Sequence, residues 1–255
     1  MKRYHFFQAF YLSFYSRDFY RDVAKNWGAE VVLYLLTFLF GCWLLASVPI
    51  QRNIGELYRV LTTHIFSQLP AEIIIEKGAI ETTEHRPYLI NEPSSKKVIA
   101  IIDISGKYHN LDQAKTDLLI TKSEIIYRDH DSQVQVKKVS PDWNYHIKSA
   151  ELPTILKAPV NFAWLILLPF LLGISFAYRL IQAVIYAVFG KVFAVLMQIS
   201  ISYTNVFKLA VMTLTPSILL GTLCDFFSVH IPHLWLSYFM ISMGYLIYAV
   251  NANRE

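Results

Sequence analysis

Residues Val31–Ile50 form a run of 20 residues without one charged side chain. The hydrocarbon core of a bilayer is about 30 Å thick, and about 20 helical residues cross it. Inside lipid every backbone N–H and C=O must be paired within the segment, so helix is the expected conformation. A signal peptide is the alternative, but its apolar region would be shorter, and Pro49 directly follows the small-residue site Ala46-Ser47-Val48. We therefore interpret 31–50 as a retained transmembrane helix.

The charged residues are distributed very unevenly. Residues 51–158 contain 14 basic and 14 acidic residues, whereas 159–255 contain only 4 and 2. Hydrophobic residues make up 55% of the chain and charged residues 16%, against about 45–50% and about 25% in soluble proteins. This map excludes a disordered chain, a coiled coil, a disulfide scaffold and a wholly soluble enzyme. It predicts an integral membrane protein with one water-exposed insert.

Four further apolar segments follow the insert and give a predicted total of five transmembrane helices. Arg179 separates the second predicted span from the third. The fourth span contains Pro216 and ends at Asp225, and a polar tail follows the fifth span. A re-entrant or amphipathic segment around 203–212 is the alternative to a full span there. The predicted segments are Val160–Tyr178, Gln182–Ile199, Phe207–Cys224 and Leu234–Val250.

The basic residues near the span ends predict the orientation. Five of them precede the first span, so we expect a cytoplasmic amino terminus. The insert 51–158 would then be extracytoplasmic, and after five spans the carboxyl terminus would be extracytoplasmic as well. The 14 basic residues of the insert are no objection, because long domains translocate largely regardless of charge.

Residues 1–30 are rich in aromatic side chains. Rings recur at spacings of three and four residues, which is typical of one apolar helix face. Packing against the bundle and a docking surface are two interpretations, but aromatic rings suit the headgroup zone of a bilayer, and we expect a cytoplasmic interfacial segment. The residues concerned are Phe6, Phe7, Phe10, Tyr11, Phe14, Tyr15, Phe19, Tyr20 and Trp27.

The insert is predicted to be a small α+β domain. Apolar residues at helical spacing, from Ile54 to Ile65, predict an amphipathic helix that ends at Pro70. Period-two alternation then predicts six strands in a small antiparallel sheet, with turns at Lys77-Gly78 and Ser105-Gly106 and a hairpin connection at 129–132. The predicted strands are Glu72–Glu76, Ala79–Glu84, Val98–Asp103, Asp117–Lys122, Glu124–Arg128 and Gln133–Lys138.

The insert contains no pattern typical of catalysis. It lacks a Gly-rich phosphate loop, a nucleophile elbow and a His-Glu-x-x-His motif, and its histidines have no metal-ligand spacing. We interpret its carboxylates as a solvated surface and predict no catalytic residue, no cofactor and no metal. The only cysteines, Cys42 and Cys224, fall in predicted spans, where they are expected to act as small buried hydrophobic residues. A disulfide bond between them is the alternative.

The order of short motifs along the chain resembles an uncharacterised family of bacterial inner-membrane proteins that includes the maltodextrin-utilisation proteins. The resemblance covers about residues 10–250 and rests on the series Leu69-Pro70, Lys77-Gly78, Pro87-Tyr88, Val98–Asp103 with Gly106, Leu118–Lys122 and Thr215-Pro216. The carboxyl-terminal spans are also distantly similar to Yip-type membrane proteins. The resemblance implies an inner-membrane location and this topology, and it brings no catalytic residues with it.

Three residues are candidates for an intramembrane function. Lys191 falls mid-span in the predicted third helix, where an ionisable side chain either lines a cavity or extends to the interface. Asp225 lies at a span end, where it caps the helix or pairs with a cation such as Lys191. Pro216 should kink the fourth span. Cys224 and Asp225, with His230 and His233, form a weaker metal-binding alternative to an ordinary surface loop.

Two classes of function fit this sequence. The first is a non-enzymatic interaction, accessory or sensing protein, whose extracytoplasmic domain docks other membrane or envelope proteins. The second is a small transporter or lipid-handling protein that uses Lys191 and the kinked fourth helix. The lipid bilayer is the expected environment in both cases. Nucleic-acid binding is not expected, because the net charge of +4 comes from membrane-flanking residues rather than a basic stripe.

Overall fold

The computed structural model describes residues 3–95, 97–229 and 232–254. The chain forms two compact units. A helical unit contains residues 1–51 and 164–255, and an insert unit contains residues 52–163. Two long helices each contribute to both units, because they pass without interruption through the points at which the units divide.

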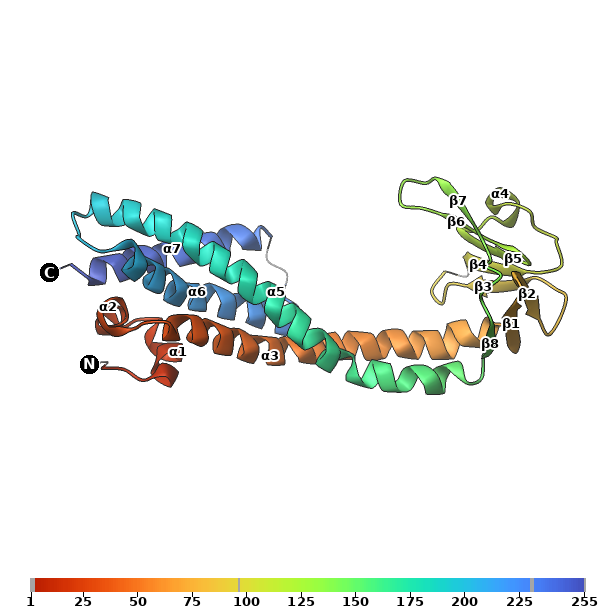
Figure 1. The fold of residues 1–255 in the computed structure, drawn as a ribbon, viewed down its shortest axis with the longest axis horizontal. Helices are drawn as coiled ribbons and strands as arrows, with labels where there is room; N and C mark the ends of the chain where they lie inside the picture. Colours follow the sequence, from red (N-terminus) through yellow and green to blue (C-terminus); the bar gives the residue numbers. More distant parts are fainter. Residues whose placement is uncertain (1–2, 96, 230–231, 255) are drawn as a thin grey trace. The chain divides into compact units, whose positions relative to one another are not determined.

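Within the described residues, four helices are long and apolar enough to cross a membrane, not the five predicted. In the helical unit they lie alongside one another (Figure 1). They are α3 (Glu30–Val60), α5 (Leu152–Leu196), α6 (Tyr203–Phe226) and α7 (Leu234–Ala252).

The count differs because the predicted second and third spans are one helix, α5. The prediction that a span ends at Arg179 is wrong, because arginine is a good helix former and one charge does not interrupt helical hydrogen bonds. The Nη1 atom of Arg179 donates to Oε1 of Gln182, one turn further along, at 2.7 Å. The guanidinium is therefore accommodated along the helix instead of ending it.

Helix α3 does not end at Ile50 either, but continues through Pro49 to Val60. A π-helical turn, η2 (Leu61–Ile65), and a short 3₁₀ helix, η3 (Phe66–Gln68), follow. The predicted amphipathic helix of the insert is thus the continuation of the first span.

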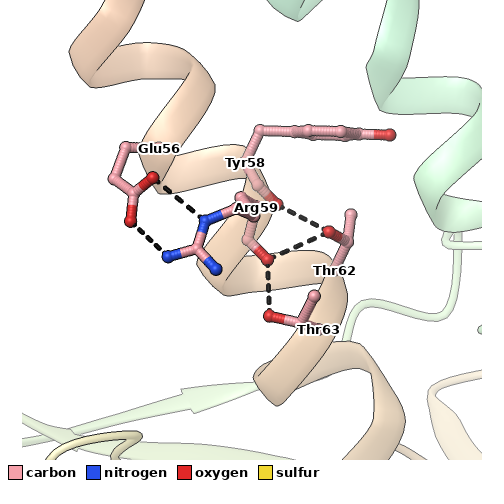
Figure 2. A network of polar contacts seen from close by, with 5 residues as sticks. All are labelled: Glu56, Tyr58, Arg59, Thr62 and Thr63. Carbon is pink, nitrogen blue, oxygen red and sulfur yellow. Dashed lines mark hydrogen bonds and ion pairs between the residues drawn. The ribbon is translucent and has the colours of Figure 1, made fainter.

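A change from α- to π-geometry weakens some backbone hydrogen bonds, and threonine side chains compensate at this point (Figure 2). The Oγ1 atom of Thr62 donates to the carbonyl oxygens of Tyr58 and Arg59 at 3.0 Å each, and Oγ1 of Thr63 donates to that of Arg59 at 2.8 Å. Arg59 also forms a two-bond ion pair with Glu56 one turn earlier. The Tyr58 hydroxyl donates to the Pro153 carbonyl at the start of α5 (2.8 Å).

The amino-terminal segment forms a cap of short helices on one end of the helical unit. These are η1 (Phe6–Gln8), α1 (Ala9–Leu12) and α2 (Arg17–Asn26). Its aromatic residues divide into two groups. Phe19, Tyr20 and Trp27 are buried in the core and pack against the bundle. The predicted interfacial role is therefore wrong for these three residues. Phe7, Tyr11 and Tyr15 are exposed, as interfacial side chains would be.

Both ends of the chain lie at this end of the helical unit. The Tyr248 hydroxyl in α7 donates to the Tyr15 carbonyl, and Nε of Arg21 in α2 donates to the carbonyl of Ala252. The five-span prediction had placed the carboxyl terminus at the opposite end from the amino terminus. With four long helices the parity changes, and that expectation is wrong.

The insert unit contains two β-sheets rather than one antiparallel sheet. One sheet has three strands in the order β2-β1-β8, and the other has five in the order β3-β4-β5-β6-β7. All pairings are antiparallel except β4–β5, which is parallel and is connected through the short helix α4 (Leu111–Ala114). The strands are β1 (Glu72–Glu76), β2 (Ala79–Thr82), β3 (Tyr88–Asn91), β4 (Val98–Asp103), β5 (Leu118–Thr121), β6 (Glu124–Arg128), β7 (Val134–Lys138) and β8 (Tyr145–Lys148).

Both faces of the five-stranded sheet are covered at strand β4. Ile101 points to the side on which α4 packs, with Leu111 and Leu119. Ala100 and Ile102 point to the other side, where Ile65, Leu69 and Ile73 pack against them. The period of two along the strand produces this arrangement.

All six predicted strands are present, with β1, β4 and β6 at their predicted bounds. The predicted turn at Lys77-Gly78 joins β1 to β2, and both residues have positive φ, as a tight hairpin turn requires. Strands β3 and β8 were not predicted. Each has four residues, too few for a clear alternating pattern.

Candidate functional site

Lys191 does not lie in the middle of a span. It is five residues before the end of α5, and its Nζ donates to the Ile201 carbonyl in the turn between α5 and α6 at 2.7 Å. The sequence-based position was wrong because α5 begins much earlier than the predicted third helix. Lys191 therefore binds a carbonyl near a helix end.

Asp225 lies at the other end of α6, one residue before that helix ends. Asp225 was predicted to lie at the end of the fourth span, and the structure agrees. A rise of 1.5 Å per residue separates Tyr203 from Asp225 by about 33 Å along the axis. Lys191 bonds the turn that precedes Tyr203, so the considered pairing of Lys191 with Asp225 does not occur.

Pro216 is buried in the middle of α6, which continues through it as a helix. Hydrogen bonds between helices flank it on both sides. The Thr215 hydroxyl shares a bond with the Tyr34 hydroxyl of α3 (2.9 Å), and the Ser242 hydroxyl of α7 donates to Ser217 Oγ at 2.9 Å. These side-chain bonds join α6 to α3 and α7 at the position where proline removes a backbone donor.

A cavity of about 170 Å³ lies between α3, α5, α6 and α7, all within the helical unit. Two opposite charges line it, Arg179 from α5 and Asp225 from α6. Among the described residues, no ion pair joins the two side chains. The other lining residues are Leu39, Cys42, Trp43, Ala46, Ser175, Ile218, Gly221, Thr222 and Tyr238.

Arg179 has hydrogen-bonding capacity to spare. Its Nη1 donates to Gln182, and Nε2 of Gln182 donates in turn to the Tyr186 hydroxyl at 2.8 Å, which forms a polar ladder along α5. The Nε atom of Arg179 is buried and has no hydrogen-bond partner in the part of the chain that the structure describes. A buried, unpaired guanidinium donor is costly, so this arrangement favours an anionic or polar guest.

Gly221 makes room for the one phenol that lines the cavity. A Cβ atom at position 221 would lie 2.6 Å from the Tyr238 hydroxyl, closer than real contacts allow. The absence of a side chain therefore lets the Tyr238 hydroxyl approach the α6 backbone beside Thr222 and Asp225, where it adds a donor and acceptor to the cavity.

Sequence reasoning missed Arg179 as a candidate, although a signal was present. It is preceded by 19 residues and followed by 11 residues without a charge, from Val160 to Tyr178 and from Leu180 to Gly190. An arginine with long apolar flanks on both sides has the pattern of an intramembrane charge. Dividing the segment into two spans hid this pattern.

One carboxylate of the insert is buried, contrary to the expectation of a solvated surface. Asp103, at the carboxyl end of β4, is 1% exposed. Its side chain accepts hydrogen bonds from the Ser105 backbone N–H (2.9 Å), the Ser105 hydroxyl (2.6 Å) and the Tyr108 backbone N–H (2.7 Å). Burial alone would raise the pKa of Asp103, but these bonds outweigh it and lower the pKa below its ordinary value. Asp103 thus orders the loop between β4 and α4.

The structure supplies no grouping of three or more His, Cys, Asp or Glu side chains that would hold a metal, within the residues it describes. Cys42 and Cys224 are both buried and free, as expected of small hydrophobic residues. In the metal-binding alternative, His230 lies outside the described residues, and His233 begins α7 in a left-handed conformation.

Comparison with known proteins gives one match. The family model described as "Protein of unknown function (DUF1189)" matches residues 7–250. No curated protein and no solved structure matches the chain. The likenesses to maltodextrin-utilisation proteins and to Yip-type proteins stay predictions. Because the family model covers nearly the whole chain, the protein belongs to the DUF1189 family of proteins of unknown function.

Proposed function

We propose that this protein is a non-enzymatic, multi-pass protein of the bacterial inner membrane that docks other membrane or envelope proteins through its insert. The amino terminus is cytoplasmic and the insert is extracytoplasmic in this proposal. The observation that carries it is the terminal strand β7, whose five residues are all exposed.

Strand β7 combines a free edge with apolar side chains. It is the last strand of the five-stranded sheet, and among the described residues it pairs with β6 alone, so its outer backbone groups face away from the sheet. Val134 and Val136 are 53% and 55% exposed on the same face. Lys137, which would discourage an added strand, lies over the Trp143 ring at 5.5 Å. An extended segment with apolar residues on one face is the partner that such an edge accepts.

The basic residues support the orientation. The end of the helical unit that carries both termini also contains Lys191, Lys208 and Arg254, in addition to the four described basic residues before α3, which are Arg3, Arg17, Arg21 and Lys25. At the other end Arg179 lines the cavity beside Asp225, and the described residues between α6 and α7 contain no lysine or arginine. An excess of lysine and arginine on one side is typical of the cytoplasmic face.

Cysteine labelling tests this orientation in a chain whose Cys42 and Cys224 are replaced by serine. A membrane-impermeant reagent should label a cysteine at Asn110 in intact cells, and label cysteines at Gln198 and Asn253 only after permeabilisation. Labelling of the Asn253 position in intact cells would refute a cytoplasmic location for the end of the helical unit that carries it.

Site-specific photocrosslinking tests the docking function. A photoreactive residue at Val136 should give a discrete adduct in intact cells, and Val134→Lys in the same chain should abolish it. The matched control is Leu89 in β3, the opposite edge strand, which is 44% exposed and should give no adduct. Equal adducts at the two positions, or an adduct at Val136 that survives Val134→Lys, would refute docking at β7.

Lipid handling is a second candidate function, and the Arg179–Asp225 cavity is the observation that favours it. A test reconstitutes the full chain in vesicles that contain a fluorescent phospholipid in one leaflet. If the unaltered chain exchanges the lipid between leaflets faster than the Arg179→Gln variant does, lipid handling is supported. Equal exchange rates for the two chains would refute it.

A further inference from the structure

We propose that the Arg179–Asp225 cavity binds a zwitterionic headgroup, with a phosphate at Arg179 and a primary ammonium at Asp225. The inference deepens the second candidate function, and it does not depend on docking at β7. It concerns binding alone, so it is tested separately from lipid movement.

The chemistry of the lining selects both charges of such a guest. The Arg179 guanidinium lines the cavity, its buried Nε–H has no hydrogen-bond partner in the described part of the chain, and guanidinium donors match the oxygen geometry of phosphate. The Asp225 carboxylate accepts hydrogen bonds and attracts a cation. A primary ammonium donates to it directly, whereas a quaternary ammonium has no N–H to donate. Two opposite charges in one cavity therefore favour a guest that carries both.

In this proposal the cavity lies at the level of lipid headgroups, near one end of the helical unit. Asp225 is one residue from the end of α6, and Tyr238 is in the first turns of α7. Aromatic side chains gather at this level, among them Trp43 in the cavity wall, and Tyr178 and Trp235, which are 59% and 69% exposed. Exposed Trp and Tyr are typical of the boundary between hydrocarbon and water.

The size of the cavity selects a headgroup rather than a whole lipid. Sites that enclose drug-sized ligands measure about 300–1,000 Å³, and this cavity measures about 170 Å³. The acyl chains would remain outside. Next to Ser175 and Arg179 in α5, an apolar ridge is available to them, because Ile174, Tyr178 and Ile181 are 70%, 59% and 62% exposed.

Native mass spectrometry of the delipidated full-length chain tests the proposal. The probes are phosphatidylethanolamine, phosphatidylcholine and phosphatidylglycerol with identical acyl chains. We expect phosphatidylethanolamine to bind at least about fivefold more tightly than the other two, because only it combines a phosphate with a primary ammonium. Equal binding of the three lipids, or tighter binding of phosphatidylglycerol, would overturn the proposal without reference to any variant.

The variants assign this selectivity to the cavity. Arg179→Gln should reduce binding of phosphatidylethanolamine about tenfold, and Arg179→Lys should restore part of it. Asp225→Asn should remove the preference over phosphatidylcholine. The matched control, Arg59→Gln with Asp112→Asn, removes the same two charges at exposed positions of the insert and should change nothing. Unchanged selectivity in both cavity variants would overturn the assignment.

Two soluble zwitterions distinguish the sources of the headgroup. Phosphoethanolamine and glycine are added in excess to the complex with phosphatidylethanolamine. Retention of the lipid identifies a membrane lipid as the guest, whereas displacement identifies a soluble zwitterion with the same chemistry. Selective binding without the leaflet exchange described above would keep this inference and refute lipid handling.

Discussion

Replacing Asp103 by asparagine should destabilise the insert by about 2–3 kcal/mol. Both carboxylate oxygens are occupied, one by the two donors of Ser105 and the other by the Tyr108 N–H. Asparagine retains one oxygen and places an NH₂ group where the second was. A buried N–H donor then faces another donor, and an unsatisfied buried group costs about 1–3 kcal/mol. The lost charge also weakens the bonds that remain, since bonds to charged groups contribute about 1.5–3 kcal/mol.

The acid dependence of stability should change in the same variant. The pKa of Asp103 is lower in the folded protein than the value of about 3.9 in an unfolded chain. The stability from this group is therefore present above about pH 4 and is lost as the pH falls through the lower folded pKa. Asparagine does not titrate, so the stability of the variant should fall less steeply between pH 5 and pH 3.

Thermal unfolding of residues 52–163 measures both effects, because Trp143 is the only tryptophan in this range and its fluorescence reports on the insert alone. For a domain of this size, 2–3 kcal/mol corresponds to a fall in Tm of roughly 6–15 °C. Asp112→Asn is the control, since the Asp112 side chain is 91% exposed and the change should lie within about 0.5 kcal/mol. An unchanged Tm and an unchanged acid profile in Asp103→Asn would refute this account of the buried carboxylate.

Three further predictions follow from the fold. Residues 52–163, expressed alone, should form a soluble α+β domain, and circular dichroism without a cooperative thermal transition would contradict this. Lys191→Met should lower the stability of the full chain by about 1–2 kcal/mol, because it removes a charged donor from a turn carbonyl. Lys191→Arg should restore most of this stability. If thermal melting in detergent is unchanged in the Met variant, the bond contributes nothing. Gly221→Ala should displace Tyr238 and lower the stability of the full chain by about 1–3 kcal/mol in the same melting assay. Gly244→Ala should leave the stability unchanged, because nothing lies within 4 Å of the added carbon. Equal effects of the two variants would refute the close approach of Tyr238 to Gly221.

Several features of this protein were determined by local sequence pattern. The apolar run 31–50 and the charge-poor carboxyl-terminal third predicted membrane-length helices, although α3 and α5 are longer than predicted. The alternating segments of the insert predicted strands at nearly the observed bounds. Each of these signals depends on hydropathy within about 5 to 20 residues, and burial in a sheet or in lipid follows directly from that local pattern. The turn at Lys77-Gly78 was also predictable, because its backbone conformation favours glycine.

Tertiary packing decided the remaining features. Arg179 was predicted to end a span, but α5 continues through it, and its Nη1 donates to Gln182 one turn further along. Helix α3 likewise continues through Pro49, beyond the predicted end at Ile50. The short strands β3 and β8 exist because β4 and β1 pair with them. The cavity brings together residues from four helices that are separated by up to 199 positions, from Leu39 to Tyr238. No local pattern encodes such a juxtaposition, since it depends on which faces of the helices pack together.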